Sequence, residues 1–130
     1  MSKPVEISTL KIGQYILINS EPCRIVEYER SKPGKHGSMK ARIVGIGIFD
    51  SVKRNLVSPV DARVDVPLIE KRSAQIISTT QDQLQLMDLE TFDIFYAAMP
   101  KDENLKRKLG SGHEVEYWRV MDSIMIMRVK

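Results

Sequence analysis

The sequence predicts an all-β protein made of two small barrels, on three observations. Runs of β-branched and aromatic residues, separated by turn residues, recur along nearly the whole 130-residue chain, which is typical of many short strands. One segment, Asp102–Leu109, has instead an acidic start, a helix-forming interior and Gly110 just past its end, the pattern of a short capped helix. A second series of strands follows Pro67, so we expect two domains, residues 1–69 and 70–130.

The first domain is expected to contain five strands. They are Gln14–Asn19, Cys23–Arg30, Lys40–Phe49, Asn55–Pro59 and Ala62–Leu68. In the second of these strands, polar and apolar residues alternate only in part. The third is almost continuously apolar and contains Gly45 and Gly47, and glycines within a strand indicate a bulge or a tight barrel bend. Residues 68–71 are expected to form a short connection to the second domain.

The second domain is expected to contain five further strands and the helix. The strands are Ser73–Thr80, Leu84–Asp88, Phe92–Ala97, Glu114–Met121 and Ser123–Val129. Three strands, a helix and two strands over about 60 residues is the element order of an OB-fold, a barrel often used to bind oligonucleotides.

Composition indicates an ordinary globular protein. No tract is long enough to span a membrane and no signal-peptide pattern follows Met1, so we expect a cytoplasmic protein that does not bind membranes. Cys23 is the only cysteine and is expected to be a small core residue, with no disulfide, metal site or bound cofactor. The net charge of +3 lies in the first half, where residues 1–70 hold 11 Lys/Arg against 8 Asp/Glu.

The most informative segment is Ser31-Lys-Pro-Gly-Lys-His-Gly37, which predicts a loop with Lys35 at its tip. Pro33 cannot donate to a strand ladder, while Gly34 and Gly37 permit backbone conformations that other residues avoid. Five basic residues and no acidic one lie between positions 30 and 42: Arg30, Lys32, Lys35, Lys40 and Arg42. A cation at the apex of a basic hairpin suits a phosphate-rich partner.

Other chemistry has less support. A Walker-type phosphate loop is excluded, because His36 stands where that loop requires Ser or Thr after the lysine. His36 is expected to shape the loop, with Pro33 and the two glycines, and His113 to be a surface residue. Acidic pairs such as Asp102/Glu103 fit helix capping better than catalysis. The aromatic residues of the second half could stack on bases, although the net positive charge that normally accompanies stacking is absent there, because residues 71–130 hold 9 Lys/Arg against 9 Asp/Glu.

The loop closely resembles the hypusine loop of the archaeal translation initiation factor 5A family. Similar landmarks cover nearly the whole chain: Leu10–Tyr15, Glu21–Cys23, Lys40–Phe49, Asp65–Pro67 and Leu86–Leu89. The resemblance implies an SH3-like first domain, an OB-fold second domain and no enzymatic activity. It also implies that deoxyhypusine synthase, using NAD and spermidine, transfers an aminobutyl group to Lys35, giving deoxyhypusine or hypusine.

The same resemblance implies a factor that binds the ribosome beside the peptidyl-tRNA and promotes peptide-bond formation, notably at proline-rich stalls. The predicted RNA contacts that flank the modified lysine in this role are Arg30, Lys32, Lys40 and Arg42. We expect the factor to act as a monomer. Two alternatives stay open: an unmodified RNA-binding protein or nucleic-acid chaperone, and, with little support, a hydrolase that uses His36 or His113.

Overall fold

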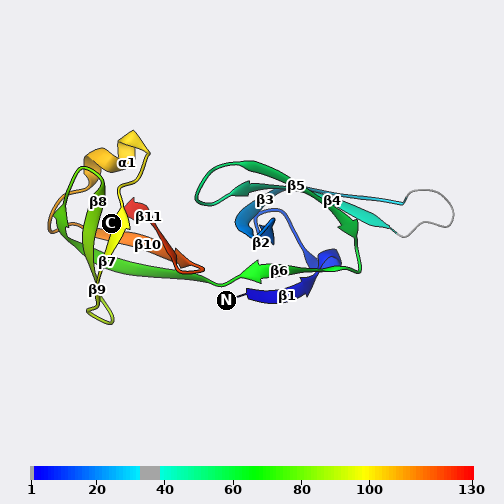
Figure 1. The fold of residues 1–130 in the computed structure, drawn as a ribbon, viewed down its shortest axis with the longest axis horizontal. Helices are drawn as coiled ribbons and strands as arrows, with labels where there is room; N and C mark the ends of the chain where they lie inside the picture. The colour runs from blue at the N-terminus through cyan, green and yellow to red at the C-terminus, as the bar shows by residue number, and fades with distance from the viewer. Residues whose placement is uncertain (1, 33–38) are drawn as a thin grey trace. The chain divides into compact units, whose positions relative to one another are not determined.

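The computed structural model describes residues 2–32 and 39–130, and the chain divides into two compact domains, Met1–Leu68 and Ile69–Lys130. Both are built almost entirely from antiparallel strands (Figure 1), so the predicted all-β class is confirmed. Within the described residues, no helix is long and apolar enough to cross a membrane.

The described residues of the first domain form six strands and one 3₁₀ turn. In chain order they are β1 (Ser2–Glu6), η1 (Ile7–Thr9), β2 (Tyr15–Ile18), β3 (Glu21–Ser31), β4 (Lys40–Gly47), β5 (Lys53–Pro59) and β6 (Arg63–Pro67). Strands β2 to β5 form a four-stranded meander, and β1 pairs with β6 as a two-stranded ribbon. Because β6 also runs along β2, the two sheets curl into the small barrel expected of an SH3-like domain.

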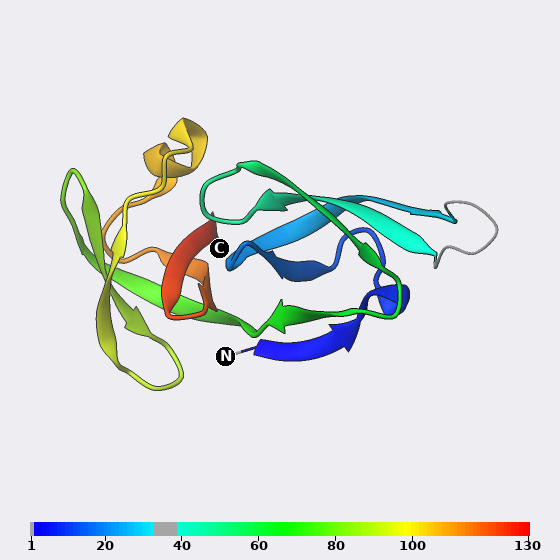
Figure 2. The ribbon, with the colours of Figure 1, turned by 45° about the vertical axis from the view of Figure 1, so that its right-hand side comes forward.

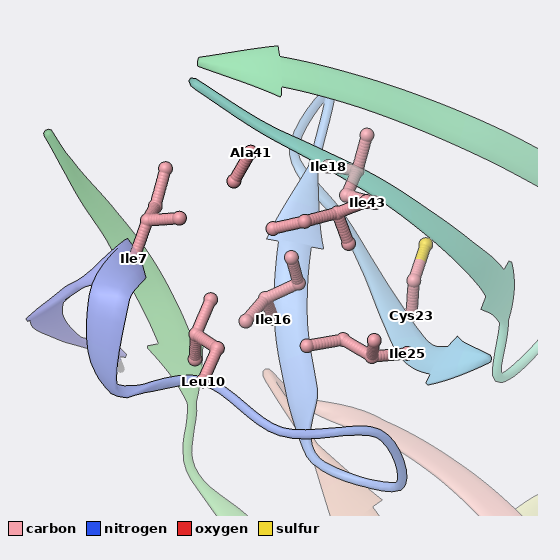
Figure 3. Packing of buried hydrophobic residues seen from close by; sticks show 8 residues of the cluster. All are labelled: Ile7, Leu10, Ile16, Ile18, Cys23, Ile25, Ala41 and Ile43. Atoms are coloured by element: carbon pink, nitrogen blue, oxygen red, sulfur yellow. The ribbon is translucent and has the colours of Figure 1, made fainter. Parts of the chain in front are cut away.

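The core of the first domain gathers side chains from η1 and three neighbouring strands (Figure 3). Its buried members are Ile7, Leu10, Ile16, Ile18, Cys23, Ile25, Ala41 and Ile43. Cys23 is fully buried, as predicted for a core residue, and burial raises the pKa of its thiol.

A β-bulge in β3 decides which side chains of the hairpin face this core. Ile25 pairs with Gly45, but Glu27 pairs with Val44, so Val26 is the extra residue. The added residue moves the following side chains to the opposite face, which turns Tyr28 inward to pack on the core. The glycines indicated a bulge, and it lies on the strand paired with Gly45.

The second domain has the predicted order of elements. They are β7 (Ile69–Thr79), β8 (Gln83–Asp88), β9 (Ile94–Ala98), α1 (Glu103–Lys108), β10 (Glu114–Val120) and β11 (Ser123–Val129). The sheet order is β11-β10-β7-β8-β9, and β9 approaches β11, so the sheet curls into the expected OB-type barrel (Figure 2). Asp102 caps α1, accepting hydrogen bonds from the amides of Asn104 and Leu105, which confirms its capping role.

One charged side chain is buried in the second barrel. Asp88 is 1% exposed and accepts hydrogen bonds from Arg72 Nε at 2.7 Å and Tyr117 Oη at 2.5 Å. It also accepts from the amides of Glu90 and Thr91, at 2.7 and 2.9 Å. The Arg72 hydrogen bond holds the pKa of Asp88 well below its usual range, while burial raises the pKa of Tyr117 to about 12.

The structure corrects three details of the predicted elements. Strand β1 and the η1 turn were not predicted, because their exposed, mixed sequence has no clear period. Residues 69–71 belong to β7 rather than to a connection, since they pair with β10. Phe92 was expected in a strand but lies in the β8–β9 turn with φ 63°, and β9 begins two residues later.

Candidate nucleic-acid interface

The β3–β4 hairpin carries the predicted site. The two strands pair along most of their length, and the last pair before the connecting residues joins Ser31 to Lys40. Figures 1 and 2 show that this end of the hairpin extends past η1 and the β5–β6 turn of the same domain. The predicted modified residue and its loop neighbours, Pro33, Gly34, Lys35, His36 and Gly37, lie outside the described residues.

The base of the hairpin is tied to the rest of the domain by Tyr28 and Arg30. Tyr28 Oη donates to the Ile7 carbonyl at 2.9 Å, and Arg30 donates to Tyr28 Oη at 3.1 Å and to the Ser8 carbonyl at 2.5 Å. The guanidinium also stacks over the Tyr28 ring, 5.5 Å from its centroid. These contacts join the hairpin to η1.

A second tie runs from η1 to the β5–β6 turn. The amides of Ile7 and Ser8 donate to the carbonyls of Ala62 and Val60, at 3.0 and 2.9 Å. The Val60 amide in turn donates to the Met39 carbonyl at 3.1 Å, next to the start of β4. The hairpin base is therefore held on both strands, and this brace uses the η1 segment that the sequence pattern did not reveal.

The predicted RNA contacts fall into two groups. Arg30 shares the inward face with Tyr28, because both follow the bulge, and its guanidinium is engaged by the brace. Lys32, Lys40 and Arg42 are exposed. On β4, Lys40 and Arg42 alternate with the buried Ala41 and Ile43, so both lie on the outer face of the hairpin. The structure thus places two exposed cations on one face, while the guanidinium of Arg30, also an exposed residue, is hydrogen-bonded within the brace.

The other end of β4, where the chain turns into β5, is fixed by an ion pair. Arg54 donates to both oxygens of Asp50, at 3.1 and 2.7 Å, and hydrogen bonds from Arg54 and the Val52 amide lower the pKa of Asp50 to about 2. A Cβ at Gly47 would overlap Asp50 Oδ1, so any other residue would have to displace this carboxylate from its place beside Arg54. Arg54 is therefore engaged in a turn.

The aromatic residues of the second domain differ in their availability for stacking. Tyr117 is 1% exposed and Trp118 9% exposed, and Phe95 packs on the core and against Tyr117. Phe92 and Tyr96 are instead 67% and 62% exposed. His113 lies in an exposed turn, and its Nδ1, in the tautomer that carries a proton there, donates to the Lys108 carbonyl 2.9 Å away.

Comparison with known proteins gives the same assignment for both domains. Residues 1–62 match the family model "Translation initiation factor 5A-like, N-terminal", and residues 68–130 match "Eukaryotic elongation factor 5A hypusine, DNA-binding OB fold". The translation initiation factor 5A of Thermofilum pendens is 52% identical over 99% of this chain and 98% of its own length. That of Pyrococcus furiosus is 50% identical over 97% and 93%.

Solved structures agree with these sequence relatives. The chain superposes on the eukaryotic translation initiation factor 5A from Methanococcus jannaschii with a TM-score of 0.88 and 42% identity, covering 99% of this chain and 95% of that one. A family protein from Naegleria fowleri gives a TM-score of 0.84 at 30% identity, covering 99% and 98%. On sequence, on fold and over nearly its full length, the chain belongs to the translation initiation factor 5A family.

Proposed function

We propose that this translation factor binds the ribosome beside the peptidyl-tRNA and promotes peptide-bond formation, notably at proline-rich stalls. Its working group is Lys35, lengthened by a spermidine-derived aminobutyl group that deoxyhypusine synthase attaches. The observation that carries the proposal is the braced β3–β4 hairpin, whose connecting residues contain the family's lysine motif and whose outer face carries Lys40 and Arg42.

The proposed mechanism is positional. The aminobutyl arm extends the reach of the lysine and adds a second basic nitrogen, so two charges can contact phosphates or ribose hydroxyls of the tRNA. Holding the acceptor end of the peptidyl-tRNA lowers the entropy that must be lost before attack. Proline is a rigid and poor nucleophile, so alignment has its largest effect there.

Each part of the hairpin has a separate role in this proposal. The Arg30–Tyr28 brace fixes the direction of the hairpin through η1. Lys40 and Arg42 bind phosphates, and each true contact should contribute about 0.7–0.9 to the logarithmic salt slope of ribosome binding. No side chain of the factor reacts during translation.

A reconstituted translation system with a proline-rich reporter tests the proposal. Wild-type factor carrying the modification should relieve the stall, and Lys35→Ala should abolish relief while leaving thermal stability unchanged. Lys32→Ala serves as the matched control and should retain relief with a smaller salt slope. Normal relief by Lys35→Ala, or native protein whose intact mass lacks an aminobutyl increment at Lys35, would refute the proposal and favour an unmodified RNA-binding protein.

A further inference from the structure

The second domain presents a surface whose charge is opposite to that of the hairpin. From Ser73 to Pro100 the sequence contains four acidic residues, Asp82, Asp88, Glu90 and Asp93, and no lysine, arginine or histidine. These residues form β8, β9 and the part of β7 that follows Arg72, and the three strands are neighbours in one sheet. Lys71 and Arg72 of β7 precede this segment, so a partner that binds the β8–β9 hairpin meets no basic side chain from either of its strands.

The outer face of the β8–β9 hairpin is uncharged and partly apolar. Leu84, Leu86 and Ala97 point into the barrel core, so the residues that alternate with them point outward. These outward residues are Gln83, Gln85, Met87, Ile94, Tyr96 and Ala98. Ile94 and Tyr96 are 58% and 62% exposed, and Ile94 pairs with Met87, so a continuous apolar strip runs along this face.

Phe92 lies in the β8–β9 turn, two residues before Ile94, in a conformation that a bulky residue rarely adopts. Its φ is 63° and its side chain is 67% exposed. Its amide donates to the Asp88 carbonyl at 2.9 Å, and the Asp88 carboxylate fixes the turn from below through the amides of Glu90 and Thr91. A strained backbone that displays an aromatic ring to solvent indicates a binding role, because glycine or asparagine would fit the fold better.

The charges around Phe92 indicate the class of partner. Arg72 pairs with Asp88 at 2.7 Å and lies 3.5 Å from Glu90, whose side chain is 76% exposed. Asp93 is exposed and lines a pocket with Arg72 and Arg119. Glu90 and Asp93 precede and follow Phe92 in the same turn, and exposed carboxylates repel phosphates and attract lysine and arginine. An apolar centre with a charged rim is the usual composition of a protein interface.

We propose that Phe92, Ile94 and Tyr96 dock on a basic protein of the ribosome, with Glu90 and Asp93 contacting its cations, an inference that rests on the ribosome binding proposed above. The factor then has two unlike contact regions: a basic hairpin for RNA on the first domain and an acidic, aromatic face for protein on the second. The competing occupants are unpaired RNA bases stacked on the rings and the basic hairpin of a second copy of this chain.

Charge reversal separates these occupants. Asp93→Lys should weaken binding of the full-length modified factor to purified archaeal ribosomes by about fivefold, because an attraction becomes a repulsion. Asp61→Lys, in an exposed turn of the first domain, makes the same change in net charge and should not weaken binding. Tighter binding by Asp93→Lys, the result expected for RNA at this face, would overturn the proposal.

Phe92→Gly tests the ring without disrupting the fold. Relief of the backbone strain should keep the melting temperature of the second domain the same or raise it, while loss of the anchoring ring should weaken ribosome binding by about tenfold. Unchanged affinity would mean that Phe92 has only a structural role and would count against the proposal.

Photo-crosslinking then identifies the partner. p-Benzoylphenylalanine at position 92 should give an adduct with a basic ribosomal protein, reduced when excess wild-type factor competes. An adduct with ribosomal RNA or tRNA, with a second copy of the factor, or no adduct at all would refute the assignment. Wild-type binding in the same assay keeps the two proposals distinguishable: if the wild type fails to bind ribosomes, the proposed function fails, and if it binds without this crosslink, only the docking face fails.

Discussion

Replacing Asp88 with asparagine should destabilise the second domain strongly, because the buried carboxylate accepts hydrogen bonds that an amide cannot. Asp88 Oδ2 accepts from Arg72 Nε and Tyr117 Oη, while Oδ1 accepts from the amides of Glu90 and Thr91. An asparagine that keeps its oxygen toward the two amides turns its NH₂ group toward Arg72, so two donors face each other.

The size of the effect follows from the same contacts. Removing one partner of a buried ion pair costs about 3–5 kcal/mol, and the Arg72 side chain, 23% exposed, keeps some hydration. We therefore expect a loss of about 3 kcal/mol in the free energy of unfolding at neutral pH. Asp93→Asn, an exposed neighbour in the same turn, is the matched control and should change stability by less than about 0.5 kcal/mol.

Urea unfolding followed by tryptophan fluorescence measures this loss directly. Trp118 is the only tryptophan in the chain and is 9% exposed on β10 of the second domain, so its emission provides a single-site probe of the unfolding of that domain. A loss below about 1 kcal/mol for Asp88→Asn would refute the reasoning, since the carboxylate would then contribute no more than an ordinary surface contact.

The pH dependence provides a second check on Asp88. Its pKa in the folded protein is lower than in the unfolded chain, so its contribution is fully present above the unfolded value of about 3.9 and decreases as the pH falls toward the folded value. The stability difference between wild type and Asp88→Asn should therefore be constant from about pH 5 to 7 and shrink below about pH 4. A difference that stays constant down to pH 2 would contradict the assigned ionisation.

Two further predictions concern the first domain. Gly47→Ala should destabilise the first domain by about 1–3 kcal/mol, because the new Cβ displaces Asp50. Calorimetry of the full chain should then show a lower transition temperature for the first domain, and an unchanged transition temperature would contradict the close packing at Gly47. Arg30→Ala should speed hydrogen exchange at the Ser31 and Lys40 amides about fivefold through loss of the brace, whereas Arg42→Ala should leave exchange unchanged and lower the salt slope of ribosome binding. Equal exchange rates in the two variants would refute the different roles given to these arginines.

Features that depend on neighbouring residues are readable from the sequence alone. Alternating apolar positions specify the strands, Asp102 and Gly110 specify the ends of the only helix predicted, and Pro33, Gly34 and Gly37 predict the loop around Lys35. Each is a local pattern, because turn geometry, capping and strand period act over a few residues. The family landmarks are equally local, so the amino-acid sequence is enough to recognise the family.

Features that depend on residues far apart in the chain emerge only when the barrels close. Arg30 and Arg42 look alike in the sequence, yet a single extra residue at Val26 turns Arg30 inward toward η1 and leaves Arg42 outside, because one bulged residue reverses the side-chain alternation of a strand. Asp88 likewise looks like a surface carboxylate. Its partners Arg72 and Tyr117 lie 16 and 29 residues away, and closure of the barrel is what brings these charges together and fixes the turn that displays Phe92.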